Sequence, residues 1–187
     1  MKIPSETTVA LQFAVGEIKR CLSLRLYYPA LQSSLSLIDA CSCLEQKNGT
    51  HKKGKAGEDF RDWATKNLLD RMGGISAEHL WQLRNGVLHQ GTARNQEGHR
   101  TFILLLGQNG LQMFGCKVTS DDPIFGGTSY INNVDLFCHA ILDEVLVWAE
   151  NADQLPNVLD NLDNLVRVRR ETICQAGTII SSAIFLG

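Results

Sequence analysis

Apolar side chains recur every three or four residues along most of this sequence, which is the spacing of one buried face of an α-helix. The first two apolar stripes are Leu11, Val15, Ile18, Leu22 and then Leu31, Leu35, Ile38, Cys41. The same spacing predicts helices over about 5–26, 30–46, 58–72, 76–91 and 133–151, and a short polar helix between Pro156 and about 170. A chain with this pattern folds as a helical bundle.

One stretch departs from the helical period. Residues 101–106 and 111–114 are apolar and flank Asn109-Gly110, a residue pair that suits a tight β-turn. We therefore expect a β-hairpin over about 101–114, followed by a loop over about 119–130. The predicted fold is mainly all-α, a bundle with an inserted β-hairpin. It forms a single domain over 1–187, with a C-terminal extension over about 156–187.

Composition fits a globular protein of the cytoplasm. Of the 187 residues, 44% are hydrophobic and 20% are charged, which excludes an intrinsically disordered chain. The longest apolar runs are far shorter than the roughly 20 residues that cross a bilayer, so we expect no membrane segment. Cys21, Cys41 and Cys138 fall on apolar helix faces, which favours reduced core cysteines and a cytoplasmic location.

Charge is divided unevenly along the chain. Residues 1–117 carry 15 basic and 10 acidic side chains, whereas residues 118–187 carry 3 basic and 10 acidic side chains. Such a molecule could bind RNA on one side or pair head to tail with a second copy. The simpler interpretation is a solvated acidic helix surface.

The segment from Leu80 to Gly91 concentrates groups that carry chemistry. It contains Arg84, Asn85 and His89, with Asn85 and His89 four residues apart on one helix face. Arg84 and His89 are five residues apart, which is about 140° around an ideal α-helix. The long Arg84 side chain must therefore wrap around the helix to reach His89, or the two groups must converge in a cleft completed by a second subunit, which is the arrangement that we expect. Asn85 and Gly86 are poor helix-interior residues, and such local violations often mark functional sites.

These residue types suit metal-free cleavage of RNA by its own 2′-hydroxyl. Histidine moves protons near neutral pH, and arginine binds a phosphate and the charge that develops on it. The alternative is structural: Arg84 and His89 near a helix C-terminus would interact favourably with the helix dipole.

The segment resembles the R-x4-6-H signature of the HEPN superfamily (higher eukaryotes and prokaryotes nucleotide-binding), in which a polar residue such as Asn85 follows the arginine. The resemblance covers roughly residues 5–150 and includes the apolar helix around Asp39, Gly54-Lys55 and Phe60-Arg-Asp-Trp63. It implies an all-α bundle that forms a homodimer, with no cofactor and no metal. Many members are metal-independent endoribonucleases of toxin–antitoxin or phage-defence systems, whereas others are silent binding modules.

On this resemblance, His89, Arg84 and Asn85 are the predicted catalytic residues and RNA is the partner, with a cognate antitoxin as a further one. Asp39, at the edge of a buried helix stripe, is a predicted supporting residue for Arg84 or His89; its alternative is a helix-edge salt bridge. A basic loop carries Lys52, Lys53 and Lys55. We expect these lysines to contact RNA phosphates, the alternative being a solvated turn.

Zinc is disfavoured as a ligand. Cys41-x-Cys43 with His51, or Cys138-His139 with Cys116, lacks the paired cysteine spacing of structural zinc sites.

Overall fold

A computed structural model describes residues 3–90, 102–105, 116–120, 127–165, 167–168, 173–175, 178–180 and 184–185. The helices are α1 (Glu6–Ser23), α2 (Tyr27–Leu44), α3 (Ala56–Asn67), α4 (Ala77–Asn85), α5 (Val134–Ala152) and α6 (Val158–Asn161). Short 3-10 turns lie at Leu69–Arg71 (η1) and Leu162–Asn164 (η3), and a π-helical turn lies at Gly86–Gln90 (η2). The described chain is mainly helical, which confirms the predicted class.

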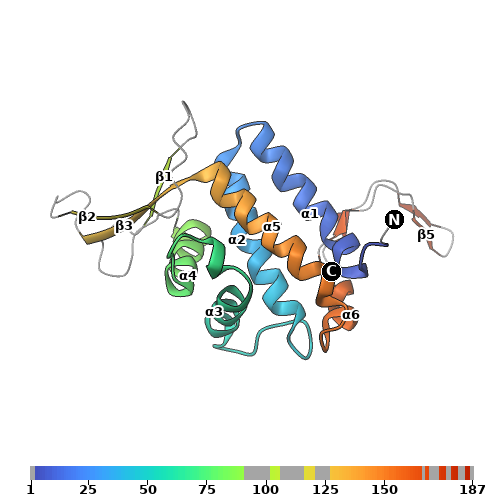
Figure 1. Cartoon of the computed structure of the whole chain (residues 1–187). Coiled ribbons are helices and arrows are strands. Elements are labelled where there is room, and N and C mark those ends of the chain that lie inside the picture. The colour runs from blue at the N-terminus through green and yellow to red at the C-terminus, as the bar shows by residue number, and fades with distance from the viewer. Residues whose placement is uncertain are drawn as a thin grey trace.

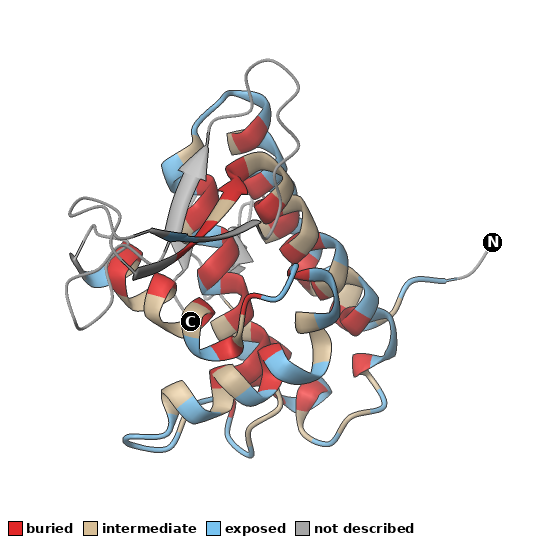
Figure 2. Ribbon diagram, turned by 60° about the vertical axis from the view of Figure 1, so that its left-hand side comes forward, coloured by how far each residue is buried: buried red, intermediate tan, exposed pale blue. Residues whose placement is uncertain are grey.

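The helices pack in two groups. Figure 1 shows α1, α2 and α5 side by side, with α3 and α4 against each other on the flank of α2. Their inward faces form one hydrophobic core, seen as the buried stripes of Figure 2. The largest fully buried side chains include Phe60, Phe137, Leu35 and Ile38. The apolar stripes predicted for α1 and α2 therefore face the core. In α5 the buried face contains Phe137, Ile141 and Val145, whereas Val147, which the sequence also suggested as an apolar core position, is 54% exposed.

Two helix boundaries follow from local chemistry. Ser5 caps α1, its hydroxyl oxygen accepting a hydrogen bond from the Thr8 amide over 3.0 Å. Helix α2 begins at Tyr27, earlier than predicted, because Pro29 occupies the first turn, where its missing N–H costs nothing. The chain reverses instead at Arg25, which has a φ of 58°.

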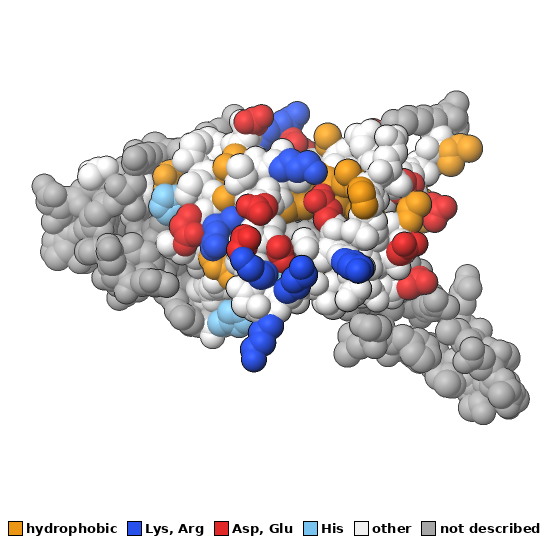
Figure 3. Space-filling view, turned by 90° about the horizontal axis from the view of Figure 1, so that it is seen from below, with side chains coloured by type: hydrophobic (Ala, Val, Ile, Leu, Met, Phe, Trp, Pro, Cys, Tyr) orange, Lys and Arg blue, Asp and Glu red, His pale blue; other side chains and the backbone are white. Residues whose placement is uncertain are grey.

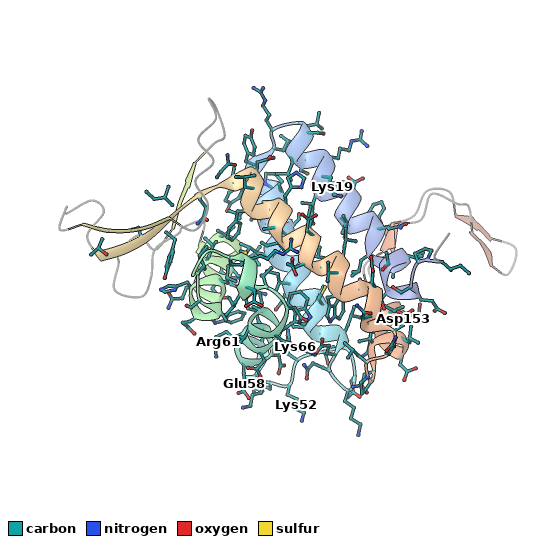
Figure 4. The ribbon with its side chains drawn as sticks, viewed as in Figure 1. Lys19, Lys52, Glu58, Arg61, Lys66 and Asp153 are labelled. Atoms are coloured by element: carbon teal, nitrogen blue, oxygen red, sulfur yellow. The ribbon has the colours of Figure 1, made fainter. Side chains whose placement is uncertain are left out.

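Asp153, which follows α5, ties the end of that helix to the start of α1. Its carboxylate accepts hydrogen bonds from the backbone amides of Glu6 (2.8 Å) and Thr7 (3.0 Å) and from the Thr7 hydroxyl (2.6 Å). Figure 4 shows Asp153 beside the start of α1. Burial acts to raise the pKa of this carboxyl, but the bonds from Thr7 and Glu6 outweigh it and lower the pKa below its ordinary value.

The described strands are β1 (Phe102–Leu105), β2 (Cys116–Ser120), β3 (Gly127–Asn133), β4 (Arg167–Val168), β5 (Ile173–Gln175), β6 (Thr178–Ile180) and β7 (Ile184–Phe185). The first three form a sheet in the order β1-β3-β2, with β1 parallel and β2 antiparallel to β3. The other pairs are β4 with β7 and β5 with β6, both antiparallel. Strand β3 runs directly into α5, and its Tyr130 packs on His79 of α4 with ring centroids 4.8 Å apart.

The strand predictions succeed only in part. The first strand of the expected hairpin is present as β1, but residues 106–115, which include its predicted turn and second strand, lie outside the described residues. The loop expected over 119–130 was wrong at both ends, because residues 119–120 belong to β2 and residues 127–130 belong to β3. The short helix expected to reach about 170 ends earlier, since β4 begins at Arg167.

None of the described helices combines the length and the apolar character that crossing a bilayer requires.

The cysteines whose side chains the structure describes are all free thiols: Cys21, Cys41, Cys43 and Cys138. Cys41 and Cys138 are fully buried, as their positions on apolar helix faces predicted, whereas Cys21, predicted with them, is only partly buried. Burial raises the pKa of Cys138 to about 11 and that of Cys41 well above its ordinary value. Both thiols therefore stay neutral at physiological pH and act as apolar core residues.

Candidate active site

Arg84 is the centre of a polar cluster between α2 and the end of α4. Its Nη2 atom donates to Asp39 Oδ2 over 2.8 Å, and its Nη1 atom lies 3.0 Å from both Asn85 Oδ1 and His89 Nε2. The structure thus brings together the four residues that sequence reasoning selected, Asp39, Arg84, Asn85 and His89. Asp39 contacts Arg84 directly, and its contact is the partly buried ion pair that the sequence left open as an alternative.

The predicted separation of Arg84 and His89 was wrong. An ideal α-helix would turn these residues about 140° apart, but the helix widens to a π-helical turn over Gly86–Gln90. In such a turn the backbone hydrogen bonds link residues i and i+5, so side chains five residues apart lie close to one face of the helix. Arg84 and His89 therefore meet within a single chain. A second subunit is not needed to bring them together. The homodimer stays a prediction.

The Arg84–His89 contact has a chemical requirement. A guanidinium only donates hydrogen bonds, so the contact is a hydrogen bond only when His89 Nε2 carries a lone pair. His89 is then the neutral tautomer with its proton on Nδ1. An exposed imidazole with a lone pair on Nε2 can accept a proton from a nearby hydroxyl.

Aromatic packing and partial burial hold the guanidinium in place. The Arg84 side chain is 15% exposed, and its Cζ atom lies 5.1 Å from the ring centroid of Trp81, one turn earlier on α4. Trp81 in turn packs on Phe60 and covers Gly57, where an added Cβ would meet the indole at 2.9 Å. Within the described part of the chain, Arg84 Nε is buried without an acceptor. The arginine therefore keeps an unused donor.

His51 and Asp59 belong to the same cluster, although sequence reasoning did not select them for it. His51 Nδ1 lies 2.8 Å from Asp59 Oδ2, and His51 Nε2 lies 3.3 Å from Asp39 Oδ1. Asp59 is in the first turn of α3, and His51 is in the loop before it. In the sequence, His51 is marked only by its place in a basic loop near Gly54-Lys55, and the cysteine spacing of Cys41 and Cys43 suggests it only as a metal ligand. Its contacts are two carboxylates instead.

The three lysines of the basic loop are exposed, as RNA contacts would require. Lys55 pairs with Glu58, and this hydrogen bond raises the pKa of Lys55 and lowers that of Glu58. Figure 4 shows Lys52 at the lower edge of the bundle, pointing outward. Seen from below, Lys and Arg side chains alternate with Asp and Glu (Figure 3). The described surface here is mixed in charge, so Lys52 and Lys53 are the stronger candidates for phosphate contacts.

Two of the pockets elsewhere on the described part of the bundle are formed between helices. One of about 410 Å³ is lined by α3, η1 and α5 residues, among them Lys66, Arg71, Glu144 and Trp148. The other, of about 440 Å³, is a mainly apolar groove between α1 and α2. Leu88, next to His89, lines its edge.

The described residues hold no group of three or more His, Cys, Asp or Glu side chains arranged to bind a metal ion. Neither a family model, nor a curated protein, nor a solved structure matches the chain.

Proposed function

We propose that this chain is a metal-independent endoribonuclease of HEPN type that cleaves RNA by attack of the 2′-hydroxyl on the adjacent phosphate. The observation that carries the proposal is the 3.0 Å contact between Arg84 Nη1 and His89 Nε2, with Arg84 anchored on Asp39. A phosphate that replaces His89 as the partner of Nη1 would lie between a fixed cation and an imidazole. This is the constellation that phosphate transesterification requires.

Each group has a role under this proposal. His89 moves a proton at the 2′-hydroxyl or at the 5′-oxygen that leaves. Arg84 binds the scissile phosphate through Nη1 and offsets the charge that develops on it. Asn85 orients Nη1 through its side-chain oxygen. Asp39 keeps the guanidinium from rotating, and Lys52 and Lys53 contact phosphates farther along the strand.

The test is cleavage of end-labelled RNA by purified protein in excess EDTA. We expect products with 2′,3′-cyclic phosphate and 5′-hydroxyl ends, because the nucleophile is internal to the substrate. An RNA with a single 2′-deoxyribose at the scissile position should survive. Cleavage of that substrate, or activity that depends strictly on Mg²⁺, would contradict the mechanism.

A second function is favoured by the same contacts. Both Nη atoms of Arg84 are already occupied, by Asp39 on one side and by Asn85 and His89 on the other. A cation so fully paired suits a catalytically silent HEPN module that binds RNA, a nucleotide or a partner protein. Equal RNA binding by wild type and His89→Ala, with no cleavage by either, would favour this module over the enzyme.

The biological role proposed with the nuclease is that of a toxin or phage-defence effector acting in the cytoplasm, with a cognate antitoxin as partner. Induced expression in bacterial cells should then arrest growth, and His89→Ala should relieve the arrest at equal protein level. Arrest by both proteins would separate toxicity from RNA cleavage.

A further inference from the structure

His51 lies between two carboxylates. Its Nδ1 atom is 2.8 Å from Asp59 Oδ2 and its Nε2 atom is 3.3 Å from Asp39 Oδ1. The side chains are 12% exposed for His51, 18% for Asp59 and 21% for Asp39. Ionised carboxylates only accept hydrogen bonds, so both contacts are hydrogen bonds only when both ring nitrogens carry protons. The geometry therefore fits a cationic His51.

Asp39 is shared between two such cations. Its Oδ1 atom faces His51, and its Oδ2 atom accepts from Arg84 Nη2. With His51 protonated, the cluster of Asp39, Asp59, His51 and Arg84 has two negative and two positive charges. With His51 neutral, the two carboxylate charges are offset only by the charge of Arg84. The cluster then has a net charge of −1, which repels a phosphate that approaches Nη1.

The backbone around His51 fixes the ring in this position. The His51 amide bonds to the Cys43 thiol on α2, and Asp59 holds the ring from α3. Burial and the nearby Asp39 raise the pKa of Cys43 to about 11, so the thiol is neutral at physiological pH. Lys52 and Lys53 follow His51 directly, so the loop that carries the predicted RNA contacts begins next to the residue that contacts Asp39, the ion-pair partner of Arg84.

We propose that His51 is a positioning residue, held as a cation between Asp39 and Asp59, whose charge offsets that of Asp39 and leaves Arg84 able to bind an RNA phosphate. The part of this inference that concerns RNA rests on the proposed function. The protonation of His51 does not, and the experiments below separate the two.

The first experiment measures His51 alone. Protein labelled with ¹⁵N-histidine is examined by two-dimensional NMR at pH 7, and the His51 signals are assigned by their loss in His51→Gln. We expect both ring nitrogens of His51 to have the shifts of protonated nitrogen. Asp59→Asn should remove one carboxylate and shift these signals toward those of a neutral ring. A neutral His51 in the wild-type protein would overturn the proposal, whether or not the protein cleaves RNA.

The second experiment measures substrate binding and turnover separately. His51→Gln should raise KM, and the Kd for an RNA blocked by 2′-deoxyribose at the scissile position, by about 5- to 30-fold, the effect of one charge several ångströms from the phosphate. The kcat should change less than about threefold, because His51 does not touch the reacting atoms. His139→Gln on α5 is the matched control, since none of these contacts involves it, and should leave both constants unchanged.

The decisive variant is the double replacement of His51→Gln with Asp59→Asn, in which Asp39 stays to anchor Arg84. It removes one carboxylate charge together with the cation that offset it, so RNA affinity should recover most of what His51→Gln loses. A purely structural His51 predicts the opposite: two replacements would weaken the protein further, and no recovery would follow. Loss of affinity without recovery in the double variant would therefore overturn the positioning role. Wild-type protein that neither binds nor cleaves RNA would refute the proposed function and the RNA part of this inference, leaving the NMR result to decide the charge of His51.

Discussion

The Tyr28 hydroxyl donates a hydrogen bond to the Val87 carbonyl oxygen over 3.0 Å, which ties the first turn of α2 to the wide turn that carries His89. Val87 belongs to that turn, so the bond from a neighbouring helix holds the backbone of the turn in place. Tyr28 therefore supports a turn geometry that is rare in isolated helices.

Tyr28→Phe should remove this support with little change in volume. We expect a loss of about 0.5–1.5 kcal/mol in the free energy of unfolding, typical of one hydrogen bond. RNA cleavage should slow several-fold, because the position of His89 relative to Arg84 depends on the turn. Denaturant unfolding and cleavage rates measure the two effects. Tyr27→Phe, which leaves this bond intact, is the control, and equal activity of the two variants would show that the turn needs no such support.

His89→Ala should reduce the cleavage rate about 10²- to 10⁴-fold, the usual contribution of a general acid–base group. His89 is exposed, so the thermal midpoint should change little. Single-turnover cleavage and thermal unfolding monitored by circular dichroism measure the two quantities. A variant that melts many degrees earlier would identify His89 as a structural residue.

Arg84→Lys keeps the charge and loses the planar fork. One ammonium group cannot contact Asp39, Asn85 and a phosphate in the geometry that the two Nη atoms provide. We expect kcat/KM to fall about 10²-fold or more. Arg61→Lys is a fitting control, because Arg61 pairs with Glu78 over 3.3 Å at a more exposed site. Near-normal cleavage by Arg84→Lys would mean that the site needs only diffuse positive charge.

Asp153→Asn should destabilise the protein in a pH-dependent manner. The folded-state pKa of Asp153 lies below its ordinary value, so the charged carboxylate stabilises the fold above the unfolded-state pKa of about 3.9. This contribution is lost as the pH falls through the lower, folded-state pKa. Wild type should therefore melt higher than Asp153→Asn at pH 7, and the difference should shrink below about pH 4. An unchanging difference between pH 7 and pH 3 would assign the effect to hydrogen-bond geometry alone. Asp160→Asn on α6 is the matched control.

The helices could be predicted from the sequence because burial imposes their period directly. Leu11, Val15, Ile18 and Leu22 all face the core, and Ser5 and Asn133 cap α1 and α5 as their side chains suggest. The strands β2 and β3 were harder to predict from the sequence. They are short and flank a run rich in Asp, Pro and Gly, which indicates a loop more strongly than the weak alternation of apolar and polar residues indicates strands.

The candidate site could be predicted only as far as local spacing reaches. Arg84, Asn85 and His89 lie within six residues, and Asp39 was marked by its place at the edge of a buried helix face. The π-helical turn was not predictable, because its support comes from Tyr28, 59 residues away in the chain. His51 lies in a loop without periodicity, and its partners come from two different helices.

The wide turn at Gly86–Gln90 is equivalent to one residue inserted into a regular α-helix. Deleting one residue from 86–88 would restore the ordinary repeat and bring the arginine and the histidine to i and i+4, which lie on one face of a regular α-helix. The five-residue spacing brings the two side chains together only in the wide turn, because in a regular helix it turns them about 140° apart. A search for an arginine and a histidine at this spacing therefore also returns chains in which the two groups never meet.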